Sequence, residues 1–443
     1  MKETIIIFTR VPIPGQTKTR FMPHLRPEEC AALHKCFLKD IYTECRKAGR
    51  DLYVFYTPEG KEEVLHPVLG EETVYRVQRG EGLGERMLHA IQAVLAEGYE
   101  SCVLIGTDVP EIKASDLRSA FHQLKISDVV FGPTADGGYY LVGMKQPYEA
   151  VFKKQIYGHE TVLENTVSAL RETNLQSAYV NMYDDMDCPE DLRGFYYRMR
   201  GNPDLQNSHT GRYLLKHIKI SIIIPIYNEE KTIDKLQKQL YSLKDKCEII
   251  FVDGGSTDGT LEKIAPDLMV IHSEKGRAGQ MNTGAQASRG DILFFLHCDS
   301  ELPEQAPAQI RYVMKESRIG GFGIAFHSRN FFMLTNRIIS NYRMKHRGII
   351  FGDQGIFMER KLFFEMGMFP RLPIMEDYQF SLNLLERGIK IGSAKQRIYT
   401  SDRRYPAGTI PKLRVMCKMF RLRRLYRSGV SAEKISDLYH DVR

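Results

Sequence analysis

Short apolar runs and longer amphipathic stretches alternate along the whole chain. The short runs are rich in β-branched residues, which is typical of strands buried on both faces of a sheet. They lie at 4–8, 52–56, 102–105, 129–131 and 139–142 in the first half, and at 220–226, 248–252 and 291–296 in the second. Between them, apolar residues recur with helical spacing, as at 27–48, 83–96 and 231–243. This alternation predicts mostly parallel sheets covered by helices on both faces.

The pattern predicts two domains, because two similar cycles follow one another. Each cycle opens with a β-branched strand and a Pro-containing polar loop, at 4–15 in the first and 220–230 in the second. Residues 201–211 between the cycles are rich in Gly, Pro, Asn and Ser and lack periodicity, which is typical of a linker. We therefore expect an α/β fold with two tandem domains: residues 1–205, a linker at 206–217, and residues 218–443.

Composition narrows the class of protein. Of the 443 residues, 43% are hydrophobic and 26% charged, as in soluble globular proteins and unlike disordered chains. No apolar run approaches the roughly 18 residues of a membrane span, and Met1–Phe8 lacks the features of a secretory signal. The eight cysteines include no CxxC pair, which indicates reduced thiols in a cytoplasmic protein. The net charge of +7 is not gathered into a reading motif, so no nucleic-acid partner is expected.

Charged residues follow the strand ends of the second half. Asp253 ends an apolar strand within Asp-Gly-Gly-Ser, where open α/β sheets bind ligands. Arg277 carries a permanent charge suited to a diphosphate, and Asp299 offers a hard oxygen ligand suited to Mg²⁺ or Mn²⁺. Glu376 and Asp377 are suited to supply a general base. Three of these have a structural alternative. The stretch at Asp253 is otherwise a plain turn and helix cap, Asp299 a residue that simply ends a strand, and the acids at 376–377 residues favoured at a helix start.

These blocks, with Tyr227-Asn-Glu229 and Gly352-Asp-Gln-Gly355, resemble family 2 glycosyltransferases with the GT-A fold over about residues 218–443. They are most similar to the subfamily named for arsenosugar biosynthesis. The resemblance implies an inverting transfer from a nucleotide-sugar donor to an acceptor hydroxyl, with a metal stabilising the leaving diphosphate. It implies that the nucleoside pocket is lined by Pro225, Tyr227, Glu229 and Asp253. Arg277 and Asn282 would lie near the phosphates, and Asp299 would hold the metal. Asp377 would act as the base, supported by Glu376.

Two positions depart from the pattern of that family. Gly254 stands where a second Asp is usual, and His297 stands where an Asp-x-Asp metal motif usually begins. His297 is either a metal ligand or a packed histidine, and packing is favoured. The loss of paired acids in both metal regions motivates an alternative function, a non-catalytic regulatory protein that binds nucleotide sugars. The Glu376–Asp377 pair argues against that alternative.

Three clusters stand out in the first half. Lys18 and Arg20 lie in a glycine-containing loop after the opening strand, which suits phosphates or is simply an exposed basic loop. Asp108 follows a buried strand, where a metal-bound nucleotide would sit, and Asp187 either completes a two-carboxylate metal site or caps a helix. Asp136 lies in another glycine loop and is a further candidate contact.

These clusters resemble the DUF2064 family over about residues 1–200, and more distantly the molybdenum-cofactor and phospholactate guanylyltransferases. The resemblance implies that both domains are GT-A-like, of the Rossmann-like nucleotide-diphospho-sugar transferase kind. It also implies a nucleotide-binding first domain and nucleotidyl transfer as its activity. Lys18 and Arg20 would hold a triphosphate, and Asp108 and Asp187 would hold Mg²⁺. The Leu-Ala-Gly-Gly opening of those guanylyltransferases is replaced by Phe8-Thr-Arg-Val-Pro-Ile-Pro-Gly15.

Residues 412–427 combine an apolar stripe with many basic residues. Val415, Met419, Leu422 and Tyr426 recur with helical spacing. A helix packed on its domain with a solvated basic face is favoured. The alternative is a helix that lies on the inner face of the membrane as a peripheral anchor. The acceptor is accordingly an unknown small molecule or a lipid.

Overall fold

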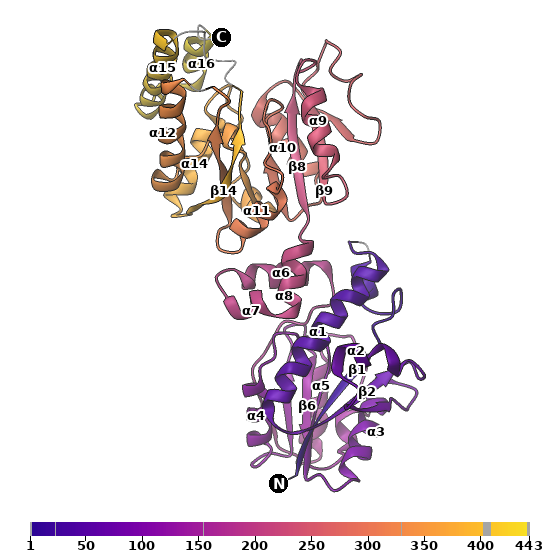
Figure 1. The fold of residues 1–443 in the computed structure, drawn as a ribbon. Coiled ribbons are helices and arrows are strands. Elements are labelled where there is room, and N and C mark those ends of the chain that lie inside the picture. The colour runs from indigo at the N-terminus through magenta and orange to yellow at the C-terminus, as the bar shows by residue number, and fades with distance from the viewer. Residues whose placement is uncertain (1, 23, 154, 329, 402–408, 441–443) are drawn as a thin grey trace. The chain divides into compact units, whose positions relative to one another are not determined.

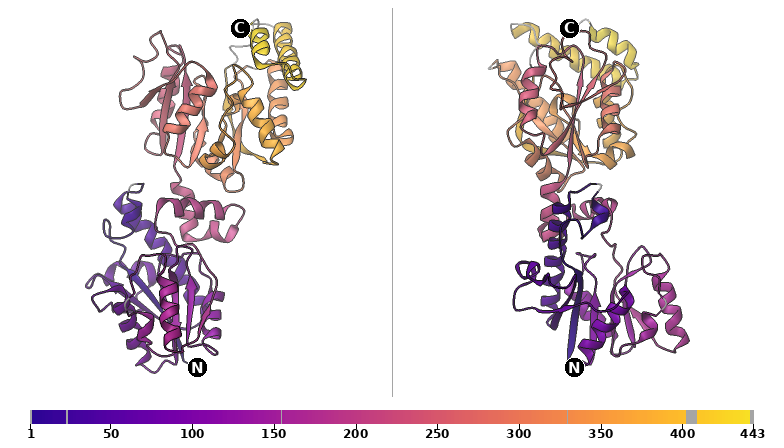
Figure 2. Two further views of the ribbon diagram at one scale, coloured as in Figure 1. Left: turned by 180° about the vertical axis from the view of Figure 1, so that it is seen from behind. Right: turned by 90° about the vertical axis from the view of Figure 1, so that its right-hand side faces the viewer.

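The computed structural model describes residues 2–22, 24–153, 155–328, 330–401 and 409–440. The chain divides into two compact units, Met1–Leu214 and Leu215–Arg443 (Figures 1 and 2). Each unit contains one seven-stranded, mostly parallel sheet with helices packed on it. The predicted fold class of two tandem α/β domains is therefore confirmed.

The first sheet has the strand order β3-β2-β1-β4-β6-β5-β7, in which β6 runs antiparallel to both of its neighbours. Its strands are β1 (Glu3–Arg10), β2 (Asp51–Thr57), β3 (Val74–Val77), β4 (Ser101–Ile105), β5 (Val129–Pro133), β6 (Tyr139–Met144) and β7 (Ser177–Tyr179). The main helices of this unit are α1 (Pro27–Ala48), α2 (His66–Leu69), α3 (Leu83–Leu95), α4 (Ala114–Gln123), α5 (Val162–Glu172) and α6 (Pro189–Met199).

The second sheet repeats this order as β10-β9-β8-β11-β13-β12-β14, again with one antiparallel strand, β13. Its strands are β8 (Ile220–Ile226), β9 (Cys247–Asp253), β10 (Met269–His272), β11 (Ile292–Phe295), β12 (Ile319–Ala325), β13 (Phe357–Glu359) and β14 (Ile391–Tyr399). Its helices are α9 (Ile233–Tyr241), α10 (Arg277–Ala287), α11 (Ala306–Met314), α12 (Phe331–Arg347), α13 (Arg360–Glu365), α14 (Glu376–Glu386), α15 (Thr409–Arg427) and α16 (Ala432–His440).

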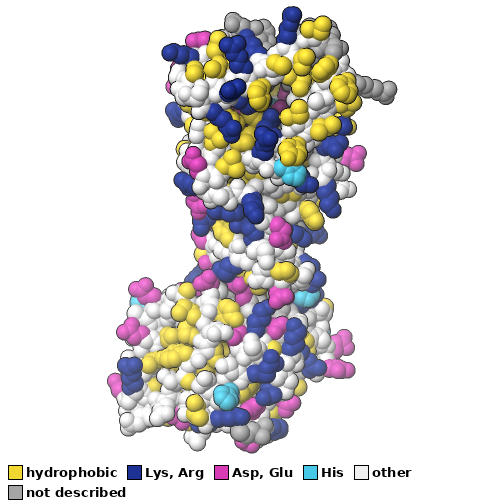
Figure 3. Space-filling model, turned by 90° about the vertical axis from the view of Figure 1, so that its left-hand side faces the viewer, with side chains coloured by type: hydrophobic (Ala, Val, Ile, Leu, Met, Phe, Trp, Pro, Cys, Tyr) yellow, Lys and Arg dark blue, Asp and Glu magenta, His cyan; other side chains and the backbone are white. Residues whose placement is uncertain are grey.

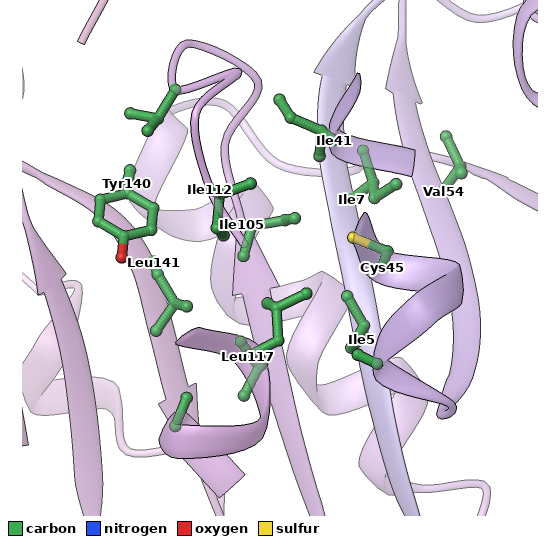
Figure 4. Packing of buried hydrophobic residues seen from close by; sticks show 14 of the residues in the cluster. Ile5, Ile7, Ile41, Cys45, Val54, Ile105, Ile112, Leu117, Tyr140 and Leu141 are labelled. Carbon is green, nitrogen blue, oxygen red and sulfur yellow. The ribbon is translucent and has the colours of Figure 1, made fainter. Parts of the chain in front are cut away.

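Side chains of β1 alternate between two hydrophobic cores, one on each face of the first sheet. Ile5 and Ile7 pack with residues of α1 and α4, among them Ile41 and Leu117 (Figure 4). Ile6 and Phe8 point to the opposite face and pack with residues of α3 and α5. A strand buried on both faces reads as the continuous apolar run seen in the sequence. This burial anchors the carboxyl end of β1, which contributes to the cavity of the N-terminal unit described below.

The segment predicted as a linker is helical. It forms α7 (Pro203–Asn207) and α8 (His209–His217). The buried carboxylate of Asp40 on α1 accepts hydrogen bonds from the backbone N–H groups of His209 and Thr210, at 2.7 and 2.8 Å, and so caps α8. The two units divide between Leu214 and Leu215, inside α8. A local absence of periodicity did not reveal this helix, because its cap comes from a distant part of the chain.

Candidate functional site

The C-terminal unit has a cavity of about 530 Å³ at the carboxyl ends of its central strands. The end of β8, the start of α10, the segment after β11 and the start of α14 all contribute to its wall. Most of the residues predicted for this half line it: Pro225, Tyr227, Glu229, Arg277, Asp299, Glu376 and Asp377. Four segments that are distant in sequence thus contribute polar groups to one concave site.

Asp377 is held firmly at the N-terminus of α14. Its Oδ2 accepts a hydrogen bond from Gly352 N at 2.8 Å, and its Oδ1 accepts one from its neighbour Tyr378 N at 2.7 Å. Each carboxylate oxygen has a second lone pair, so both can still accept a proton or a hydroxyl hydrogen bond. Met375, just before the helix, has a left-handed backbone with φ 70°. Such backbone strain in a non-glycine residue is concentrated at functional sites.

Glu376 contacts Arg277 across the cavity. The Oε1 atom of Glu376 lies 3.7 Å from Nη1 of Arg277, and the Glu376 side chain is almost fully buried. Arg277 opens α10, so the pair links the start of that helix to the start of α14. Glu376 is therefore placed to orient the guanidinium that is predicted to meet phosphates.

Asp299 and His297 follow β11 and both line the cavity. A Cβ atom at Gly352 would lie 2.5 Å from Nε2 of His297, so His297 fills the space beside this glycine. Within the described residues, no group of three or more His, Cys, Asp and Glu side chains is arranged to hold a metal. The single carboxylate of Asp299 fits Mg²⁺ or Mn²⁺ as a cation that also takes diphosphate oxygens and water.

Asp253 does not line the cavity. It is buried, and its carboxylate accepts hydrogen bonds from Gly255 N at 3.0 Å and from Ser256 Oγ at 2.6 Å. Burial raises the pKa of Asp253, but these hydrogen bonds lower it by more, so the net shift is downward. In this structure the carboxylate shapes the loop after β9, and its contact with a nucleobase stays a prediction.

The absent second Asp at Gly254 has a steric explanation. A Cβ atom on Gly254 would lie 3.0 Å from Nε2 of Gln280. The Gln280 amide donates to the carbonyl oxygens of Ile226 and Val252, each at 2.8 Å, and so joins the ends of β8 and β9. A larger residue at 254 would therefore press on the Gln280 amide that forms this bridge.

Asn282 also lies outside the cavity wall. Its Nδ2 donates to the carbonyl of Phe369 at 2.8 Å, and its Oδ1 accepts from Phe369 N at 3.1 Å. The buried amide thus holds the chain at Phe369, and its predicted place near the phosphates stays a prediction.

Several residues of the cavity had no signal in the sequence. Lys275 Nζ lies 4.0 Å from the ring centroid of Tyr227, a cation–π contact at the mouth of the predicted nucleoside pocket. The tail helices contribute Met419, Ser436 and Tyr439 to the wall. A basic residue beside Gly276 was the one local hint for Lys275. Met419 was predicted only as part of an apolar stripe, and no local pattern marks Ser436 or Tyr439.

The N-terminal unit has a second cavity, of about 700 Å³, lined by Lys18, Arg20, Asp108 and Asp187 among others. Lys18 Nζ lies 2.6 Å from Asp108 Oδ1 and 3.0 Å from Asp187 Oδ1, and it donates to the Met186 carbonyl at 2.6 Å. Burial lowers the pKa of Lys18, but the two carboxylates raise it by more, so the ammonium stays charged. All three ammonium hydrogens have acceptors. Lys18 thus occupies the space between the two predicted Mg²⁺ ligands, and these residues do not fit a metal in this arrangement.

Asp136 lies outside that cavity wall. Its Oδ1 accepts hydrogen bonds from Thr134 Oγ1 at 2.5 Å and Gly138 N at 3.1 Å, which close the turn between β5 and β6. Asp185 was not singled out in the sequence. Burial and the nearby carboxylates of Asp136 and Asp187 raise the pKa of Asp185 to about 6.

Two family models match the chain, and they match separate regions. Residues 42–159 match the family described as an uncharacterized protein conserved in bacteria, DUF2064. Residues 221–370 match glycosyl transferase family 2. The chain therefore combines a DUF2064 region with a family 2 glycosyltransferase region, as the motifs predicted. The arsenosugar-type subfamily stays a prediction.

Curated relatives are similar over part of the chain. Glycosyltransferase AglE of Haloferax volcanii is 35% identical over 98 residues, which is 19% of this chain and 32% of that protein. An undecaprenyl-phosphate 4-deoxy-4-formamido-L-arabinose transferase of Aeromonas hydrophila is 24% identical over 155 residues, 31% of this chain and 47% of that protein. The chain thus spans between a third and a half of the length of these relatives.

Among solved structures, a candidate nucleotide-diphospho-sugar transferase from Desulfovibrio desulfuricans G20 is 30% identical. The match covers 48% of this chain and 94% of that one, with a TM-score of 0.46.

Proposed function

We propose that the C-terminal unit transfers a sugar from a nucleotide-sugar donor to an acceptor hydroxyl with inversion at the anomeric carbon. One observation carries the proposal: a single cavity gathers Tyr227, Arg277, Asp299 and the Glu376–Asp377 pair at the ends of a parallel sheet. The family 2 match over residues 221–370 supports it.

Asp377 is the proposed general base. The acceptor O–H proton passes to the carboxylate, the acceptor oxygen bonds to the anomeric carbon, and the bond to the diphosphate oxygen breaks with its electron pair leaving on the diphosphate. Arg277, oriented by Glu376, contacts the diphosphate. Lys275 and Tyr227 contact the nucleoside side of the donor. A bound Mg²⁺ or Mn²⁺, held by Asp299, supplies neutralisation of the diphosphate charge.

The base assignment predicts the behaviour of Asp377→Asn. Turnover of nucleotide sugars is expected to fall by about 10²–10⁴-fold, because general-base catalysis contributes that much. Binding of the nucleoside diphosphate, measured by calorimetry, is expected to persist. Glu386→Gln, at the exposed far end of the same helix, is the matched control.

The assay follows release of UDP or GDP from their sugars in the presence of Mn²⁺ and a lipid extract. Full turnover by Asp377→Asn would overturn the base assignment. Donor binding by the wild-type chain without turnover on any acceptor would favour the alternative, a regulatory nucleotide-sugar-binding protein.

For the N-terminal unit we propose a nucleotide-binding role without a metal-dependent step. Its cavity presents Arg10, Arg20 and Arg86, which suit phosphate groups, while Lys18 holds both Asp108 and Asp187. Nucleotidyl transfer would require Lys18 to release these carboxylates. Titration of the full chain with nucleoside triphosphates in the presence of a chelator tests this, since metal-free binding that Arg20→Ala and Arg86→Ala weaken is expected.

A further inference from the structure

Helix α12 exposes large apolar side chains along one face. Phe331, Leu334, Ile338 and Tyr342 follow one another at spacings of three and four residues, so they share a side of the helix. Phe331 is 72% exposed and Ile338 62% exposed, and Ile339 beside them is also exposed. The opposite side, with Met333, Ser340 and Met344, is buried in the unit. A helix on a water-facing surface normally carries polar residues where α12 carries these.

Helix α15 adds a second exposed apolar row. Ile410, Leu413 and Phe420 are spaced by three and seven residues, and Phe420 is 66% exposed. The apolar stripe predicted for this helix does not face outward. Its residues Met419, Leu422 and Tyr426 belong to a buried cluster that also contains Ile349, Met375 and Tyr378. The stripe therefore holds α15 on its unit, and a different row faces outward. Helices α12 and α15 contact each other, so the two rows belong to neighbouring elements.

Both helices are strongly basic. Helix α12 contains four Lys or Arg residues and α15 contains seven, and neither contains an Asp or a Glu. Together they carry more positive charge than the net +7 of the whole chain. Figure 3 shows hydrophobic and basic side chains intermixed on the C-terminal unit, on the side where Figure 1 places α12 and α15.

We propose that α12 and α15 form a docking surface for an anionic lipid bilayer. The exposed aromatic and aliphatic side chains enter the boundary between headgroups and acyl chains, and the exposed Lys and Arg side chains contact lipid phosphates. Aliphatic side chains such as Ile338 and Leu413 favour a bilayer over a nucleic acid, whose backbone offers them no apolar partner. No helix among the described residues has the length and apolarity needed to span a bilayer, so the attachment is peripheral.

Helix α15 links the docking surface to the cavity. It contributes Met419 to the cavity wall, and its next residue, Phe420, is exposed on the outside. An acceptor carried in the bilayer would then meet an enzyme already held there. This last step rests on the transferase activity proposed above, whereas the docking itself does not.

Vesicle flotation of the full chain tests the docking surface. The expected result is that the protein floats with phosphatidylcholine vesicles containing 30% phosphatidylglycerol at 150 mM salt, and not with phosphatidylcholine alone. The double variant Ile338→Ser/Phe420→Ser is expected to lower the bound fraction at least tenfold. The double variant Arg421→Glu/Arg424→Glu is expected to do the same, since both arginines are exposed.

Matched controls are Ile126→Ser, 75% exposed in the N-terminal unit, and Lys390→Glu, exposed in the C-terminal unit. Both are expected to float as the wild type does, and an unchanged Tm checks that the variants are folded. A wild-type chain that does not float, or floats equally with both vesicle types, overturns the proposal. The proposal is also overturned if the wild-type chain binds no vesicles but forms a dimer or a nucleic-acid complex, and Ile338→Ser/Phe420→Ser disrupts that complex.

Discussion

Gly352 lies where the His297 side chain of the C-terminal cavity leaves no room for a Cβ atom. His297 would be 2.5 Å from such an atom, and the backbone N–H of Gly352 positions Asp377 at 2.8 Å. The spacing of Gly352-Asp-Gln-Gly355 indicated a family motif, but the sequence could not show that its first glycine separates a histidine from the base. This arrangement depends on contacts among the segments that carry His297, Gly352 and Asp377, which are distant in sequence, so no local pattern could predict it.

Gly352→Ala is expected to lower kcat about 10²-fold with little change in donor affinity. The added methyl group shifts His297 or the Gly352 N–H, and a misplacement of about 1 Å costs that much at a catalytic group. Gly82→Ala, where a Cβ atom has open space, is the control. Steady-state kinetics give the answer, and an unchanged kcat would contradict the packing argument.

His34 is a buried histidine that the sequence did not single out. Its Nε2 lies 3.1 Å from Thr107 Oγ1 in the N-terminal cavity wall. Burial, with a smaller effect of Lys18, lowers the pKa of His34 to about 3. The unfolded chain takes up this proton near pH 6.5, so stability is lost as pH falls from about 6.5 towards 3.

His34→Gln removes that proton uptake. The variant is therefore expected to lose less thermal stability than the wild type between pH 7 and pH 4, measured as the change in Tm. His122→Gln, at an exposed position, is the control. An equal loss of Tm in wild type and His34→Gln would show that another group carries the acid sensitivity.

At the scale of elements, local pattern predicted eight strands, among them β1, β4 and β11, but it did not predict the buried strands β12 and β13. The continuous apolar run at 4–8 became β1, and the amphipathic stretch at 27–48 became α1. Strand β14 was not predicted, because Lys395 and Arg397 interrupt its apolar positions. It is the edge strand of the sheet, where charged residues prevent pairing with other chains. Helix α8 was missed for another reason, since Asp40 supplies its cap from 169 residues away.

Asp40→Ala is expected to cost about 0.5–2 kcal/mol, the usual loss when a capping side chain is removed. Hydrogen exchange is expected to rise first at His209 and Thr210, whose N–H groups lose their acceptor. Urea unfolding and exchange of the full chain measure both effects, with Asp204→Ala on exposed α7 as the control. Unchanged exchange across α8 would show that packing alone holds the helix.

At the scale of the whole molecule, one strand order occurs twice. Asp108 follows β4 and Asp299 follows β11, and each of these is the central strand of its seven-stranded sheet. The sequence predicted for each aspartate separately that it follows a buried strand, and the structure shows that the two strands hold the same place in their sheets. It could not predict that Lys18 fills the space beside Asp108, since that ion pair joins residues 90 positions apart.

The two carboxylates are therefore expected to differ in their response to a metal. Mn²⁺ is expected to increase the thermal stabilisation of the full chain by nucleoside diphosphate, and Asp299→Asn or a chelator is expected to remove that increase. Asp245→Asn, at an exposed position, is the control. An increase that survives in Asp299→Asn would place the metal elsewhere.

The repeated strand order also bears on how the chain is made. Each sheet takes all of its strands from one unit, and the first of them in sequence, β1 or β8, lies beside the central strand. During translation, at about 5–20 residues per second, the first 214 residues emerge well before β14 does. The first sheet can thus close while its counterpart is incomplete. A denatured full-length chain has both sets of strands available at once, and it loses the protection that ordered synthesis provides against strands joining the wrong sheet.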